Sequence, residues 1–157
     1  MLYVAYGSNI PTKQILSRCP SAVFYGKGFI KDYELKFNFH ADIEPCIGEK
    51  VPCVVWDIDN VDFQMLDYYE GYPRYYGRHY VFVELENGEM EKAIVYEMNI
   101  ERKVLTSPSK DYVDCIRSGY KEFNLDEWHL DKAIDEIGID NRTEEKYYRY
   151  VVDTKED

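Results

Sequence analysis

The chain has 157 residues, of which 45% are hydrophobic, and its 30 acidic and 19 basic side chains give a formal net charge of -11. This length and apolar content predict a single domain over residues 1–157, with a core that needs no disulfide or metal. An acidic chain without a basic stripe lacks the cations that displace counterions from a phosphate backbone, so nucleic acid is excluded as a partner.

The sequence pattern also argues against a membrane span and a metal site. No apolar stretch approaches the ~20 residues of a membrane span, and residues 1–4 lack the basic region and long apolar core of a signal peptide. We therefore expect no membrane partner and a cytoplasmic location, where thiols stay reduced. The cysteines and histidines are not spaced as zinc ligands, which predicts no metal site; they are Cys19, Cys46, Cys53, Cys115, His40, His79 and His129.

The first 20 residues predict a strand, a turn and a helix in succession. An apolar run over residues 2–6 predicts a buried strand, which Gly7-Ser8-Asn9 ends in a polar turn. Pro11 suits the first position of a helix that ends before Pro20. Such a strand end brings backbone N–H groups and small polar side chains to one point, where they can bind a carbonyl or carboxylate oxygen. An ordinary surface turn has the same local pattern.

Two further strands are expected between residues 33 and 56. Apolar and polar side chains alternate over residues 33–39, which predicts a half-buried strand. Residues 51–56 form a denser apolar run typical of an interior strand, although Pro52 places its first half at an edge or in a bulge. The segment between the two strands, residues 40–50, is expected to be a loop.

The middle of the chain predicts a helix and a hairpin. Apolar side chains recur at helical spacing over residues 61–70, and Gly71 ends that helix. Residues 79–86 and 91–97 are rich in β-forming side chains and are joined through Asn87-Gly88, which is a strong hairpin signal.

Two helices are predicted after the hairpin. Ser107-Pro108 begins the first, which Gly119 is expected to end, and the second carries Leu130, Ala133, Ile134 and Ile137 before Gly138. The charged tail over residues 141–157 is expected to be peripheral. Strands joined mostly by short turns, followed by helices, predict an α+β fold with a mixed, strongly curled, barrel-like sheet of five to six strands flanked by helices.

Glu70 is the side chain best suited to acid–base chemistry. It lies among tyrosines at the end of a predicted helix, where unpaired carbonyls disfavour a carboxylate by about 0.3–1 kcal/mol. Apolar surroundings and the helix dipole both raise the pKa of such a carboxyl, so that it can take up and return a proton near neutral pH. A surface glutamate at the end of an amphipathic helix has the same local pattern. Asp67, one turn earlier, is a weaker second candidate.

Other catalytic classes have little support in the sequence. The chain has no G-x-S-x-G elbow, P-loop or dinucleotide fingerprint. Ser8 has no histidine near it in the sequence, which disfavours serine hydrolysis. The abundant acidic residues fit a solvated surface better than a glycosidase-like carboxylate pair.

Four short motifs occur in a fixed order over about residues 2–126. They are Tyr3-Val4-Ala5-Tyr6-Gly7-Ser8-Asn9, Leu66-Asp67-Tyr68-Tyr69-Glu70-Gly71, Ala93-Ile94-Val95-Tyr96 and Pro108-Ser109-Lys110-Asp111-Tyr112. Each motif is weak alone, but four in order with suitable spacing are specific. Together they resemble the gamma-glutamylcyclotransferase family.

This resemblance implies a small curled-barrel fold and an enzyme that converts a gamma-glutamyl amine or amino acid to 5-oxoproline and the free amine. No cofactor is implied, and the partner is a small-molecule gamma-glutamyl substrate. The general acid/base of the family matches Glu70, and its substrate-contacting tyrosine matches Tyr112. The loop that binds the glutamyl group matches Tyr3, Val4, Ala5, Tyr6, Gly7, Ser8 and Asn9, and Tyr96 is expected to shape the pocket.

Two alternatives to a general gamma-glutamyl cyclotransferase remain at this point. A relative specific for gamma-glutamyl-lysine or for a biosynthetic gamma-glutamyl amine would share the same catalytic residues. A non-catalytic small-molecule or protein-binding module would share the fold. The sequence does not identify the leaving amine or the oligomeric state.

Overall fold

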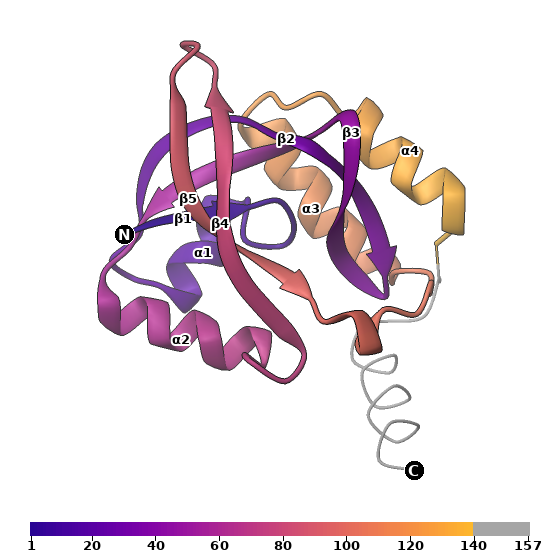
Figure 1. The fold of residues 1–157 in the computed structure, drawn as a ribbon, viewed down its shortest axis with the longest axis horizontal. Helices are drawn as coiled ribbons and strands as arrows, with labels where there is room; N and C mark the ends of the chain where they lie inside the picture. Colours follow the sequence, from indigo (N-terminus) through magenta and orange to yellow (C-terminus); the bar gives the residue numbers. More distant parts are fainter. Residues whose placement is uncertain (140–157) are drawn as a thin grey trace.

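The computed structural model describes residues 1–139, in which five strands and four α-helices surround one core (Figure 1). The predicted peripheral tail, residues 141–157, lies outside these described residues. The elements are β1 (Leu2–Ala5), α1 (Thr12–Arg18), β2 (Val23–Asn38), β3 (His40–Asp57), α2 (Asn60–Glu70), β4 (Tyr76–Leu85), β5 (Met90–Met98), a short 3-10 turn η1 (Ile100–Arg102), α3 (Lys110–Glu122) and α4 (Trp128–Ile137).

The strands form a closed barrel in the order β1-β3-β2-β4-β5. Strand β1 pairs antiparallel with β3 and closes the barrel by pairing parallel with β5, where Tyr3 lies opposite Ile94. In Figure 1, α2 lies at the lower left and α4 at the right, so helices flank the sheet. The predicted α+β fold with a mixed, barrel-like sheet is confirmed, and the sheet has five strands.

The loop predicted over residues 40–50 is wrong, because these residues belong to β3. They pair with β2 in a long hairpin whose strands are joined at Phe39, which has a φ of 70°. The residue at the tip is a phenylalanine and no Asn-Gly or Asp-Gly pair occurs there, so the usual hairpin signal is missing. A bulge at Asp32, opposite the segment that contains Gly48, further breaks the alternation that a strand shows in sequence.

The apolar run at the end of β3 belongs to the hydrophobic core. Its residues 51–56 are all buried, because one side of the strand faces the barrel interior and the other side is covered. Phe123 at the end of α3 packs edge-on against Trp56, with ring centroids 5.9 Å apart. Within β3, only residues 54–57 pair with β1, so among the described residues Pro52 has β2 as its neighbour on one side and no strand on the other. This placement agrees with the predicted edge position of Pro52.

Two helix boundaries differ from the sequence predictions. Pro11 is the N-cap of α1 and not its first residue. Gly119 lies inside α3 and does not end it; a Cβ at Gly119 would come within 2.6 Å of the Ile10 side chain. Glycine is therefore required here by the close approach of α3 to the segment that precedes α1.

Gly28 has a similar requirement where β2 pairs with β4. A Cβ at Gly28 would lie 1.9 Å from the carbonyl oxygen of Glu84, so the two strands would have to separate. We expect Gly28→Ala to lower the free energy of unfolding by about 2 kcal/mol, as measured by urea denaturation. Gly26→Ala is the matched control, because its Cβ would meet the movable Leu85 side chain at 3.2 Å. Equal losses in the two variants would contradict this explanation.

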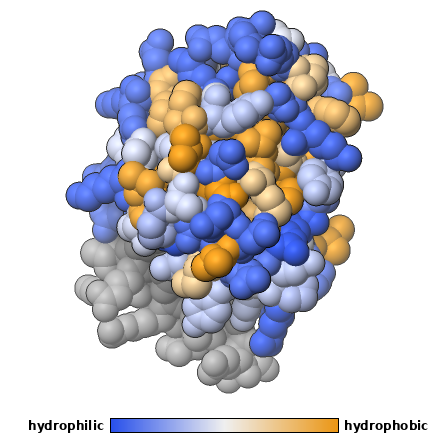
Figure 2. All heavy atoms as spheres, turned by 90° about the vertical axis from the view of Figure 1, so that its left-hand side faces the viewer, coloured by the Kyte–Doolittle hydropathy of each residue, from blue (hydrophilic) through white to orange (hydrophobic). Residues whose placement is uncertain are grey.

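The surface combines hydrophilic side chains with separate groups of apolar ones, as Figure 2 shows for the face on the left of Figure 1. Exposed apolar side chains of this kind are ordinary on a folded domain. In residues 1–139 no helix has both the length and the apolar character to cross a membrane.

Candidate active site

A cavity of about 270 Å³ lies beyond the C-terminal end of β1. Segments from α1, α2, α3 and all strands except β2 contribute to its wall. The site residues predicted from the sequence line this cavity, except Ala5, which is buried in the core, and Asp67, the second candidate base. The lining residues are Tyr3, Val4, Tyr6, Gly7, Ser8, Asn9, Gln14, Arg18, His40, Ala41, Tyr69, Glu70, Tyr76, Tyr96, Tyr112 and Cys115.

Glu70 is the last residue of α2, and it lines the cavity. Asp59 caps the start of this helix, and Gly71 ends it in the left-handed conformation with a φ of 63°. The chain therefore turns away immediately after Glu70. Burial raises the pKa of the Glu70 carboxyl from 4.5 to about 7, and the Arg18 guanidinium opposes this rise. Within residues 1–139 no donor forms a hydrogen bond to this carboxyl.

The loop after β1, with Gly7, Ser8 and Asn9, lines the same cavity. A turn in which the Ile10 amide donates to the Gly7 carbonyl, at 3.1 Å, folds the loop on itself. The Trp56 indole anchors it by donating to the Asn9 carbonyl, also at 3.1 Å. Within the described residues the amides of Gly7, Ser8 and Asn9 donate to no protein acceptor. These three N–H groups can therefore bind oxygen atoms of a ligand.

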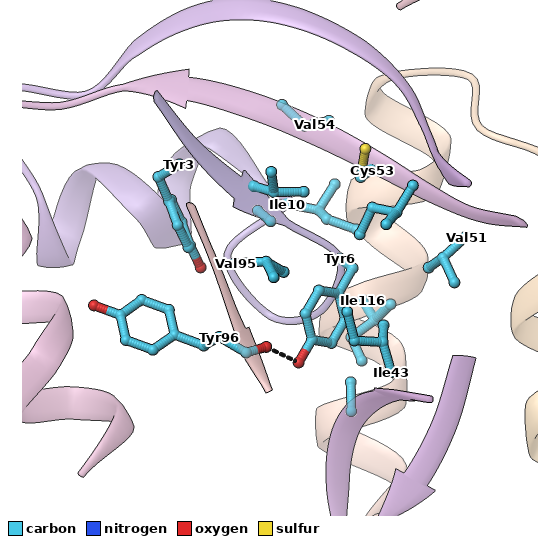
Figure 3. Close-up of a cluster of buried hydrophobic side chains, with 14 of the residues drawn as sticks. Tyr3, Tyr6, Ile10, Ile43, Val51, Cys53, Val54, Val95, Tyr96 and Ile116 are labelled. Carbon is cyan, nitrogen blue, oxygen red and sulfur yellow. Dashed lines mark hydrogen bonds between the residues drawn. The ribbon is translucent and has the colours of Figure 1, made fainter. Parts of the chain in front are cut away.

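Three tyrosine hydroxyls connect the elements that form the cavity wall. The Tyr6 hydroxyl donates to the Tyr96 carbonyl at 2.6 Å, which ties the loop to β5 (Figure 3). The Tyr112 hydroxyl accepts from the Ala41 amide at 3.0 Å, and the Tyr76 hydroxyl donates to the Ala41 carbonyl at 3.1 Å. The start of β3 is therefore fixed between β4 and α3.

Asp67, the second candidate base, does not line the cavity. Its carboxylate accepts from the Tyr96 hydroxyl at 2.6 Å and forms an ion pair with Arg78. Asp67 therefore holds the outer end of the Tyr96 side chain, while Glu70 is the acidic side chain that faces the cavity.

The sequence reasoning did not find several lining residues, of which Arg18 and His40 carry the most chemistry. Arg18 lies in the last turn of α1, and its guanidinium donates to the Asn9 side chain. A basic residue in the helix that directly follows the loop was the available signal. His40 lies in the segment that was expected to be a loop. Its ring packs against the Tyr112 ring, with the two ring centroids 5.1 Å apart. The others missed are Gln14, Ala41, Tyr69, Tyr76 and Cys115.

No disulfide joins any of the four cysteines, all of which lie within residues 1–139. In the part of the chain that the structure describes, no three or more His, Cys, Asp or Glu side chains are grouped so that they could hold a metal ion. The chemistry available at the cavity is thus that of one carboxyl with a raised pKa, one guanidinium, a histidine, a thiol, side-chain amides, several phenols and backbone amides.

Almost all residues that line this cavity lie in a part of the chain that matches known proteins. The profile of the family described as gamma-glutamyl cyclotransferase, AIG2-like, matches residues 3–114, a range that contains every lining residue except Cys115. Gamma-glutamylcyclotransferase from Bos taurus is 33% identical over 137 residues, covering 79% of this chain and 72% of the relative. The protein of that name from Homo sapiens is 30% identical over 141 residues, with the same two coverages.

The fold agrees with a solved structure as well. A protein named gamma-glutamyl cyclotransferase superposes with a TM-score of 0.80 at 29% identity, and the match covers 91% of this chain and 90% of that one. Sequence and structure comparisons therefore both match proteins named gamma-glutamylcyclotransferase over most of the chain.

Proposed function

Because this chain belongs to the gamma-glutamylcyclotransferase family and is an enzyme of that type, we propose that it converts a gamma-glutamyl amine or amino acid to 5-oxoproline and the free amine. We assign Glu70 as the general acid/base. The observation that carries this proposal is a carboxyl that faces the cavity and has a pKa of about 7, close to the value at which proton uptake and release are both efficient near neutral pH.

The proposed reaction is an intramolecular aminolysis. The α-amine of the glutamyl group attacks its own γ-carbonyl carbon, forming the new carbon–nitrogen bond of a five-membered ring. Glu70 takes a proton from the attacking nitrogen and delivers it to the departing nitrogen as the original amide bond breaks. Because nucleophile and electrophile belong to one molecule, a large part of the rate enhancement comes from holding the glutamyl chain bent.

The loop after β1 is proposed to bind the glutamyl oxygens. The N–H groups of Gly7, Ser8 and Asn9, which have no acceptor within residues 1–139, are held by the folded loop before the substrate arrives, so they can stabilise a developing oxyanion without reorganisation. Tyr112, Tyr6 and Tyr96 are proposed to shape the pocket around the bent chain.

Turnover of a substrate panel tests this proposal directly. Gamma-glutamyl dipeptides, glutathione, gamma-glutamyl-lysine and simple gamma-glutamyl amines are incubated with the protein, and products are read by mass spectrometry. We expect 5-oxoproline and the free amine in equal amounts from at least one of them. Thermal stabilisation by these compounds without any 5-oxoproline would contradict the proposal and would indicate a binding module.

The dependence of kcat/KM on pH provides a second readout of the same assignment. Glu70 must be ionised to accept a proton, and its pKa is raised to about 7. We therefore expect kcat/KM to fall about tenfold for each pH unit below about 7, in a profile measured from about pH 5 to about pH 9. An acid limb that lies near pH 4 would exclude Glu70 as the base.

A further inference from the structure

Arg18 fixes the orientation of the Asn9 side chain beside the cavity. The Arg18 Nη1 donates to Asn9 Oδ1 at 2.7 Å, and the Asn9 Nδ2 donates to the Tyr3 hydroxyl oxygen at 3.0 Å. A guanidinium has only donors, so the carboxamide oxygen must face Arg18. The carboxamide nitrogen then has to face Tyr3.

This orientation determines where the Tyr3 proton points. The Tyr3 oxygen accepts the Asn9 proton, so the single hydroxyl proton of Tyr3 is directed elsewhere. Among residues 1–139 the Tyr3 hydroxyl donates to no acceptor, although the side chain is buried and lines the cavity with Glu70. The Tyr3 ring extends from β1 toward Tyr96 of β5, with the hydroxyl at its far end (Figure 3). A donor directed in this way is available to a ligand in the cavity.

Arg18 is itself held in place by two neighbours. The Tyr69 ring lies under its guanidinium, 5.0 Å from the ring centroid. The Gln14 carboxamide, oriented with its oxygen toward Arg18, accepts from Nη2 at 2.8 Å and from Nε at 3.2 Å. Within the described residues Arg18 forms no ion pair with a carboxylate, so all of its close acceptors are neutral. Its positive charge therefore remains available to act on groups in the cavity.

We propose that Tyr3 donates its hydroxyl proton in a hydrogen bond to the γ-carbonyl oxygen of the substrate, and that Arg18, acting through Asn9, is the positioning residue that directs it. This assignment rests on the proposed cyclotransferase function. Tyr3 would stabilise the oxyanion together with the loop amides. Burial and the nearby Glu70 charge both raise the pKa of Tyr3, so it stays protonated and remains a donor throughout the working pH range.

Kinetics of four variants test this assignment. Tyr3→Phe should lower kcat about 30-fold with a smaller change in KM, because the bond strengthens in the transition state. Arg18→Met should lower kcat by a similar factor, and Arg18→Lys should lose less of the wild-type kcat than Arg18→Met does. Lys13→Met is the matched control, because it removes the same charge from an exposed position on the same helix, and it should behave as the wild type.

The double variant separates positioning from an independent effect. If Arg18 acts through Tyr3, Arg18→Met should lower kcat by a much smaller factor in a Tyr3→Phe background than in the wild type. Arg18→Met should also move the acid limb of the pH profile upward, because the guanidinium opposes the rise in the pKa of Glu70. Tyr3→Phe should leave that limb near its original position. Additive losses, or wild-type kcat in Tyr3→Phe, would overturn the proposal.

A readout without substrate keeps this test separate from the proposed function. Hydrogen exchange of the Asn9 side-chain amide, followed by ¹⁵N NMR, should be slow in the wild type and in Lys13→Met. It should be at least tenfold faster in Tyr3→Phe and Arg18→Met. Unchanged exchange in Arg18→Met would overturn the positioning role even if no substrate were turned over. Absence of 5-oxoproline with the expected exchange pattern would instead overturn the assigned reaction, and with it the role of Tyr3 toward a γ-carbonyl.

Discussion

Glu70→Gln should lower kcat/KM by at least about 10³-fold while making the folded protein more stable above neutral pH. Glutamine keeps the shape of the side chain but cannot take a proton from the attacking amine, and loss of a positioned acid/base costs about 10²–10⁴ in rate. The comparison is made by 5-oxoproline release at pH near 8. A variant that releases 5-oxoproline at the wild-type rate would remove Glu70 from the mechanism.

The expected gain in stability follows from the raised pKa of Glu70. The folded protein holds this proton more tightly than the unfolded chain, so the free energy of unfolding falls as the pH rises from 4.5 to about 7. A shift of this size corresponds to at most about 3 kcal/mol, so removing the charge should return about 1–3 kcal/mol above pH 7.

Thermal unfolding at two pH values measures this gain. The difference in Tm between Glu70→Gln and the wild type should be small near pH 4 and large near pH 8. Glu89→Gln is the control, because Glu89 is exposed in the hairpin turn, and it should alter neither activity nor the pH dependence of Tm. A variant that is less stable than the wild type at pH 8 would show that Glu70 is stabilised by its surroundings and is not strained by them.

Local sequence patterns were sufficient for most elements of the fold. Gly71 ends the helix that contains Glu70, as the sequence predicts, and the Asn87-Gly88 turn joins β4 and β5. The β2–β3 hairpin was partly missed because Phe39 forms its tip and a bulge interrupts it. Gly119 was misread because its need for a small side chain arises from contact with Ile10, more than 100 residues earlier.

The residues of the candidate site also differ in whether local sequence or tertiary contacts reveal their role. Glu70 and the loop after β1 are visible in short stretches of sequence, because a helix end and a strand end create their chemistry locally. Arg18 matters through its bonds to Asn9 and its charge near Glu70, and both depend on how α1 folds back over the loop. Such a role becomes visible only when the three-dimensional arrangement is known.

Gly7→Val should lower kcat/KM by at least about 10²-fold, whereas Ser8→Ala should stay within about tenfold of the wild type and far above Glu70→Gln. Gly7 has a φ outside the left-handed region, so the backbone accepts an L-residue and the constraint is one of space. A Cβ added at Gly7 would lie 3.1 Å from the Ala41 Cβ and 3.4 Å from the Tyr112 hydroxyl. The further methyl groups of valine would push the loop and its N–H groups away from the substrate, and displacements near 1 Å can cost about 10²-fold.

Ser8 differs because its contribution is proposed to come from its amide and not from its hydroxyl. The Ser8 Oγ accepts a long hydrogen bond of 3.3 Å from Arg18, which also bonds Asn9 at 2.7 Å, so alanine leaves the main contact of Arg18 intact. Alanine also keeps the backbone N–H in place. Both variants are compared by 5-oxoproline release, with circular dichroism to confirm folding. If Ser8→Ala were as inactive as Glu70→Gln, the hydroxyl and not the backbone of this loop would carry the chemistry.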